Sequence, residues 1–170
     1  MLTITSKFKG EKEMRKNILV VMTGILVLAL ATIAIAAEDP FVGTWKLNAE
    51  KTKFPPGQEM KSYVIKWEKN GSGYRNVIDM TGATNVAFHV EFAGQEEGVD
   101  YPITGNPIAN TISFKKIDTN TVEATLKRTG TAVARLQSSI SADGKTLTIL
   151  QTIIGASGIE TASTIILDKQ

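Results

Sequence analysis

The feature that most restricts the fold is a regular succession of short runs rich in β-branched and aromatic residues. From Lys61 onward, Gly, Asn, Asp and Pro separate these runs at intervals of about ten residues, a rhythm typical of an all-β sandwich or barrel. After the N-terminal apolar segment no run has helical periodicity, which argues against a parallel α/β sheet. The predicted strands are 44–47, 62–68, 74–80, 85–92, 111–117, 121–128, 133–140, 146–153 and 162–167, with a further candidate at 99–103.

Several connections between these runs carry turn signals. Asn70-Gly71 and Asp143-Gly144 predict hairpins with type I′ turns, because both central residues of that turn need positive φ. Residues 118–120 and Gly94-Gln95 indicate tight turns through their Asp, Asn and Gly content. Short links of this kind join antiparallel neighbours, so we expect an up-and-down meander.

Alternation of apolar and polar residues then assigns the faces of the sheet. Tyr63, Ile65 and Trp67 share one face, opposite Ser62, Lys66 and Glu68. The run 86–92 places Val86, Phe88, Val90 and Phe92 on one face, and the run 122–126 shows the same period. A sheet with one wet face and no covering helices most simply buries its apolar face by closing on itself. We therefore predict an all-β fold, an up-and-down antiparallel β-barrel of about eight to ten strands, with a sandwich as the alternative.

The N-terminal segment 1–37 has the pattern of an export signal. Lys12, Arg15 and Lys16 precede an uncharged run from Ile18 to Ala37. The run ends in Ala34-Ile35-Ala36-Ala37, an Ala-x-Ala pattern that fits cleavage after Ala36 or Ala37. The apolar run is also long enough to span a bilayer, so an uncleaved anchor is the alternative. Met14, directly before Arg15, would itself begin a normal signal. We expect one folded domain, 38–170, in a secreted or periplasmic protein.

Composition limits the partners of this domain. Residues 38–170 contain 14 Lys and Arg against 15 Asp and Glu, so the domain is near neutral and lacks the basic excess of nucleic-acid-binding proteins. The chain has no cysteine, which excludes disulfides, a thiol nucleophile and a cysteine-based metal site. We expect a monomer with no cofactor, attached to a membrane only if segment 1–37 is uncleaved.

The run Phe41-Val42-Gly43-Thr44-Trp45-Lys46-Leu47 resembles the first strand of the lipocalin and fatty-acid-binding-protein superfamily. Bacterial avidins and nitrobindin-like haem barrels share its Gly-Thr-Trp. The resemblance to the lipocalin superfamily implies a structural role for Trp45, which would plug the barrel floor, and for Lys169, which would pack on it. The function would then lie at the opposite end of the barrel.

A longer resemblance is to a group of secreted bacterial lipocalin-like proteins of the calycin superfamily, which brings a fold and no activity with it. The matching segments are 43–48, 51–57, 100–107, 117–123, 143–148 and 168–170. Fatty-acid-binding proteins carry a two-helix lid between their first two strands. Here residues 48–60 contain Pro55-Pro56-Gly57 and cannot form that lid, so we expect an open mouth or one covered by a plain loop.

Polar residues on apolar faces are the candidate ligand contacts. Asn76 lies two residues from both Tyr74 and Ile78, so it shares their face of the predicted strand. By the same spacing Arg128 shares a face with Leu126, and Gln151 shares one with Ile149. Our hypothesis is that Arg128, Gln151 and Tyr74 orient the polar head of a lipophilic ligand. The alternatives are that Arg128 reaches solvent at the strand end and that backbone or water satisfies Asn76 and Gln151.

The aromatic side chains on the apolar faces can be interpreted in two ways, as cavity lining or as core. Those of Tyr63, Trp67, Phe88, Phe92 and Phe114 would either line a cavity or fill the core. The candidate ligand-binding residues are therefore Tyr74, Asn76, Arg128, Gln151, Trp67 and Phe88, and we predict no catalytic or metal-binding residues.

Metal binding, haem binding and acid–base catalysis have weaker support in the sequence. His89 is the only histidine and lies in the outward phase, so zinc and haem sites are not expected. Glu96, Glu97 and Asp100 form an acidic group on a loop, best interpreted as solvated.

We expect a non-enzymatic exported barrel that binds or carries a small lipophilic molecule. The alternative is an interaction module with a packed barrel that binds protein or polysaccharide through its rim loops. A calycin-type enzyme that uses loop carboxylates is a third, weaker candidate.

Overall fold

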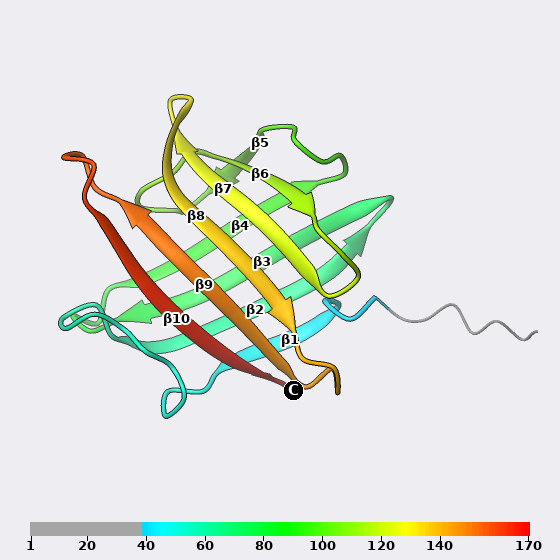
Figure 1. The fold of residues 1–170 in the computed structure, drawn as a ribbon, viewed down its shortest axis with the longest axis horizontal. Coiled ribbons are helices and arrows are strands. Elements are labelled where there is room, and N and C mark those ends of the chain that lie inside the picture. Colours follow the sequence, from blue (N-terminus) through cyan, green and yellow to red (C-terminus); the bar gives the residue numbers. More distant parts are fainter. Residues whose placement is uncertain (1–38) are drawn as a thin grey trace, which may run out of the picture. The chain divides into compact units, whose positions relative to one another are not determined.

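Residues 39–170, the part of the chain that the computed structural model describes, form a closed barrel of ten antiparallel strands (Figure 1). The strands are β1 (Gly43–Leu47), β2 (Met60–Asn70), β3 (Gly73–Gly82), β4 (Ala87–Gly94), β5 (Tyr101–Thr104), β6 (Thr111–Lys116), β7 (Thr121–Arg128), β8 (Thr131–Ile140), β9 (Thr146–Ile154) and β10 (Glu160–Lys169). Each strand pairs with its neighbours in the chain, and β1 closes against β10. The predicted up-and-down barrel is confirmed over its sandwich alternative, and the candidate strand at 99–103 is β5. The predicted signal segment 1–37 lies outside the described residues.

Alternation along the strands builds the apolar interior. Tyr63 and Ile65 on β2 are buried, as are Val90 on β4 and Leu126 on β7. One assignment was wrong: Val86, predicted on the inner face, is half exposed and precedes β4. The reason is local, because Asn85 has φ 63 in a turn that delays the start of the strand.

The hairpins are present, although their turns differ from the prediction. Asn70 is the last residue of β2 and pairs with Gly73, so Gly71 and Ser72 are the central residues of the turn. Gly71 alone has positive φ, at the first central position, as in a type II′ turn. At the β8–β9 connection Gly144 has positive φ and donates its N–H to the Ser141 carbonyl, while Asp143 has negative-φ backbone. The connection is therefore longer than a two-residue type I′ turn.

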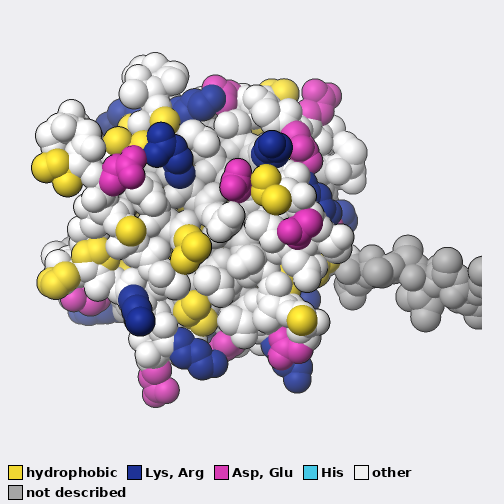
Figure 2. Space-filling model, viewed as in Figure 1, with side chains coloured by type: hydrophobic (Ala, Val, Ile, Leu, Met, Phe, Trp, Pro, Cys, Tyr) yellow, Lys and Arg dark blue, Asp and Glu magenta, His cyan; other side chains and the backbone are white. Residues whose placement is uncertain are grey.

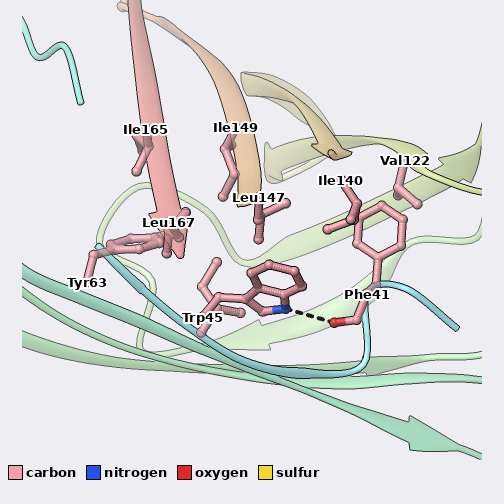
Figure 3. Packing of buried hydrophobic residues seen from close by; sticks show 10 residues of the cluster. Phe41, Trp45, Tyr63, Val122, Ile140, Leu147, Ile149, Ile165 and Leu167 are labelled. Carbon is pink, nitrogen blue, oxygen red and sulfur yellow. Dashed lines mark hydrogen bonds between the residues drawn. The ribbon is translucent and has the colours of Figure 1, made fainter. Parts of the chain in front are cut away.

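Trp45 belongs to the buried core of the barrel. It is fully buried, and its indole Nε1 donates a hydrogen bond to the Phe41 carbonyl at 2.8 Å (Figure 3). Leu147 and Leu167 pack into the same cluster and are also fully buried. The Lys169 ammonium lies 5.2 Å from the centre of the Trp45 ring. These contacts join the chain before β1 to the last strands of the barrel.

The barrel has two ends that differ in their connections. We call one the Trp45 end: it carries Asp39 and the turns at 71–72, 95–100, 117–120 and 141–145. The opposite end carries the loops 48–59, 83–86, 105–110, 129–130 and 155–159. Loop 48–59 has no helix, as predicted, and Lys53 pairs with Thr164 through two backbone hydrogen bonds.

The outer surface is mixed in character. Figure 2 shows hydrophobic side chains scattered among charged and polar groups on one face of the molecule. The large exposed apolar residues are Val86, Val99, Ile117, Leu150 and Ile159, distributed over different loops and strands. Within residues 39–170 no helix has the length and apolar character needed to cross a membrane.

Candidate functional site

The interior of the barrel contains a cavity of about 610 Å³. Apolar side chains from β2 to β9 form most of its wall, which includes Tyr63, Ile65, Trp67, Ile78, Met80, Phe88, Val90, Phe92, Ile112, Phe114, Val122, Leu126, Leu136 and Ile149. The five aromatic residues considered in the sequence therefore surround a space instead of filling it. Ligand pockets for small molecules typically have this size and lining.

Most of the predicted ligand contacts converge on this cavity. Tyr74, Asn76, Trp67, Phe88 and Gln151 all line it. They come from four strands, β2, β3, β4 and β9, and their convergence follows from closure of the sheet. Gln151 accepts a hydrogen bond of 3.4 Å from the Ser163 hydroxyl, so its carbonyl already has a partner in the protein.

Arg128 does not line the cavity with the others. It is exposed at the end of β7, and its guanidinium donates hydrogen bonds to the carbonyls of Pro107 and Ile108 at 2.5 and 2.8 Å. Pro107 and Ile108 border the cavity. Arg128 therefore holds a loop at the opposite end of the barrel, and this contact places its charge away from the interior.

Trp67 and Asn76 form an unusual pair in the cavity wall. They are direct partners in the β2–β3 ladder, and Asn76 has only 2 % of its surface exposed. Within residues 39–170 neither the indole Nε1 nor the amide Nδ2 has a hydrogen-bond acceptor, although both atoms are buried. A buried donor without a partner costs about 1 to 3 kcal/mol, so two adjacent ones call for an explanation.

A polar cluster borders the cavity at the Trp45 end. Asp39 accepts hydrogen bonds from the Tyr74 hydroxyl and from the Lys69 ammonium, the latter at 3.2 Å. The Lys116 ammonium lies 3.9 Å from the same carboxylate. Burial would raise the pKa of Asp39, but hydrogen bonds from Tyr74, the Phe41 amide and Lys69 outweigh it and hold that pKa below its ordinary value of 3.8. Asp39 is therefore ionised at neutral pH.

Two tyrosine hydroxyls stay protonated in this environment. Burial raises the pKa of Tyr63 to about 12. Burial also raises the pKa of Tyr74, and its hydrogen bond to the Asp39 carboxylate acts in the same direction. Both side chains line the cavity as neutral hydroxyls.

Comparison with known proteins provides no family to which the chain could be assigned. No model of a known protein family matches this sequence, and no curated protein matches it either. The functional assignment therefore rests on the barrel, its cavity and its polar groups.

Residues considered for other chemistry lie apart from one another. His89 is exposed on the outer face, with its Nδ1 2.7 Å from an Asp79 oxygen. Glu96 and Glu97 are exposed on loop 95–100, and Asp100 forms an ion pair with Lys127 at 2.6 Å. Among residues 39–170 no group of three or more His, Cys, Asp or Glu side chains has an arrangement suited to a metal ion.

Two features of the site went unrecognised in the sequence. Asp39 was interpreted only as part of the segment after the predicted cleavage site, and its contacts with β2, β3 and β6 arise from the closed fold. The pairing of Trp67 with Asn76 depended on the exact position of the hairpin turn. The predicted turn at Asn70-Gly71 would have paired Trp67 with Tyr74, whereas the observed turn at 71–72 pairs it with Asn76.

Proposed function

We propose that this protein binds and carries a small lipophilic molecule inside its barrel. The observation that carries the proposal is the cavity of about 610 Å³, lined mainly by apolar and aromatic side chains. A barrel that acted only through its rim loops would have no need of such a space, because filling it with side chains would strengthen dispersion contacts and stability. The cavity therefore favours a carrier over a packed interaction module.

The calycin relationship and the export of the protein belong to the same proposal. The lipocalin-like segments of the sequence, the up-and-down barrel and the signal pattern of residues 1–37 support a secreted or periplasmic carrier. The near-neutral domain has no charge excess that would direct it to nucleic acid. A non-enzymatic role in binding is consistent with the solvent exposure of Glu96 and Glu97 and with the ion pair between Asp100 and Lys127.

Native mass spectrometry of the protein, purified after expression of the full chain, tests the proposal directly. We expect a bound small molecule that co-purifies and is released by organic solvent. The same spectrum gives the chain mass, which we expect to correspond to cleavage after Ala36 or Ala37. A chain of full length would instead support the uncleaved anchor.

A matched pair of variants then tests whether binding occurs in the cavity. Ala124 lines the cavity on β7, whereas Ala87 is exposed on β4. Ala124→Phe would fill part of the space and lower the affinity for the apolar dye Nile red by at least about tenfold, or ~1.4 kcal/mol. Ala87→Phe adds the same group outside and should leave affinity unchanged. Equal affinities in all three proteins would contradict binding inside the barrel.

A further inference from the structure

The polar pair in the cavity wall is held in a defined orientation. The Trp67 ring packs against Phe41, with ring centres 4.8 Å apart, and edge-on against Tyr74 at 6.0 Å. Phe41 is 1 % exposed and belongs to the same cluster as Trp45. Asn76 is fixed opposite Trp67 by the strand ladder. The two donors therefore belong to a rigid part of the wall, as a preorganised recognition site requires.

Counting hydrogen-bonding groups shows what the pair lacks. Trp67 has one N–H, and the Asn76 amide has two N–H groups and one carbonyl oxygen. The two ends of an asparagine amide can exchange places by rotation, so the Asn76 carbonyl could turn toward the indole. The pair would still have an excess of donors over acceptors. Residues 39–170 supply no acceptor for these donors, and an oxygen of a bound molecule would complete the pair.

The charges around the cavity distinguish a neutral acceptor from an anionic one. At the Trp45 end the carboxylates of Asp39 and Glu97 border the cavity together with the two lysines Lys69 and Lys116, and Glu59 adds a carboxylate at the opposite end. Both lysines lie within 4.0 Å of the Asp39 carboxylate. An anionic ligand would bring a further negative charge into a space whose cations are already paired, which is costly in an apolar environment. A neutral oxygen avoids this cost.

We propose that Trp67 and Asn76 recognise the carbonyl oxygen of a neutral lipophilic ligand, such as a ketone, aldehyde or ester. This inference rests on the proposed function and adds the class of ligand and its orientation. The ligand carbonyl lies toward the Trp45 end of the cavity, because the Trp67–Asn76 pair is only two residues along β2 and β3 from the Lys69–Tyr74 pair at that end. The apolar body extends along Ile65, Ile78 and Met80 toward the opposite end.

Indole N–H resonances provide a direct test with an internal control. The protein has two tryptophans, and Trp45 already donates to the Phe41 carbonyl whereas Trp67 has a free Nε1. In a ¹H–¹⁵N spectrum, titration with methyl octyl ketone should shift the Trp67 indole signal downfield and leave that of Trp45 nearly unchanged. Trp67→Phe assigns the two signals. A saturating titration with no selective shift of the Trp67 signal would overturn the inference.

Affinity measurements with three ligands of equal carbon number, methyl octyl ketone, decane and decanoate, test the chemistry. Asn76→Leu removes the amide at similar volume, and Trp67→Phe removes the indole N–H. Each should weaken binding of methyl octyl ketone by about tenfold and leave the affinity for decane within about twofold. Gln137→Leu makes a comparable change on the exposed face of β8 and should alter neither. Circular dichroism checks that each variant is folded, and the indole titration itself is carried out on the unaltered protein, with Trp67→Phe used only to assign the signals.

The outcomes separate this inference from the proposed function. If ketone and decane bind but neither variant selectively weakens the ketone, the donor pair is not the recognition site and the carrier proposal stands. If decanoate binds tightest and loses most affinity in the variants, the pair recognises an anion and the neutral class is wrong. If no ligand binds and none co-purifies, the carrier proposal itself fails.

Discussion

At the residue scale, the side chain that defines the site is an amide on an otherwise apolar face. Asn76 was recognisable in the sequence because its phase matched Tyr74 and Ile78, and it is indeed buried in the cavity wall. Arg128 satisfied the same criterion but lies at the rim, bonded to loop carbonyls. Phase alone could not separate the two cases. The difference is that a long side chain at a strand end can reach a partner outside the barrel, whereas a short one in mid-strand cannot.

Asp39→Asn tests the polar cluster at the Trp45 end. The folded protein lowers the pKa of Asp39, so the carboxylate stabilises the fold above the ordinary pKa of 3.8, and this contribution is lost as pH falls through the lower folded-state value. We expect the variant to be less stable by about 1 to 2 kcal/mol at neutral pH, mainly through the hydrogen bond from Tyr74. Urea denaturation of both proteins between pH 7 and pH 2 measures it. A stability difference that did not shrink at low pH would show that the charge is irrelevant.

At the element scale, strand positions followed from the sequence and turn geometry did not. Runs rich in β-branched and aromatic residues, bounded by turn residues, located nine strands and the candidate at 99–103, which is β5. Alternation then assigned the faces, because the hydrophobic effect acts on every second residue of a strand with one face in the core. The turns depend on a few backbone angles that neighbouring strands help to set. Asn70-Gly71 illustrates this, since pairing of Asn70 with Gly73 moves the turn by one residue and makes Gly71 its first central position.

Gly105, directly after β5, should be essential to the connection that borders the cavity. It has φ +69, and a Cβ atom there would lie 1.8 Å from the His89 carbonyl oxygen. Gly105→Ala should therefore destabilise the protein by about 3 kcal/mol, combining backbone strain with a collision against a strand. Gly98→Ala is the matched control, because Gly98 has φ +74 with nothing within 4 Å of the added carbon. There we expect only about 1 kcal/mol. Thermal unfolding compares the two, and equal losses would mean that the close approach is unimportant.

At the scale of the whole molecule, closure of the sheet makes the site. The sequence predicted a barrel because a one-sided sheet without helices has few other ways to bury its apolar face. It did not reveal whether the interior was hollow. That depends on how side chains from opposite walls meet, such as Phe88 on β4 and Ile149 on β9, which alternation along a single strand does not encode.

The seam between β1 and β10 should be necessary for the barrel. It comprises three residue pairs, of which Leu47 with Leu167 includes a fully buried side chain. Deleting residues 167–170 would remove Leu167 from the core and leave β1 and β9 with unpaired edges. We expect this variant to aggregate in size-exclusion chromatography and to lose ligand binding. Deleting only Gln170 should be tolerated, and a monomeric, ligand-binding 1–166 chain would show that the seam is dispensable.

The position of that seam also sets the order in which the barrel assembles. Every other strand pair joins neighbours along the chain, whereas Trp45 and Lys169 meet across more than a hundred residues. Loop closure over that distance carries the largest entropic penalty in the fold, so hairpins form first and the seam last. A nascent chain therefore cannot complete its folding before its final strand emerges.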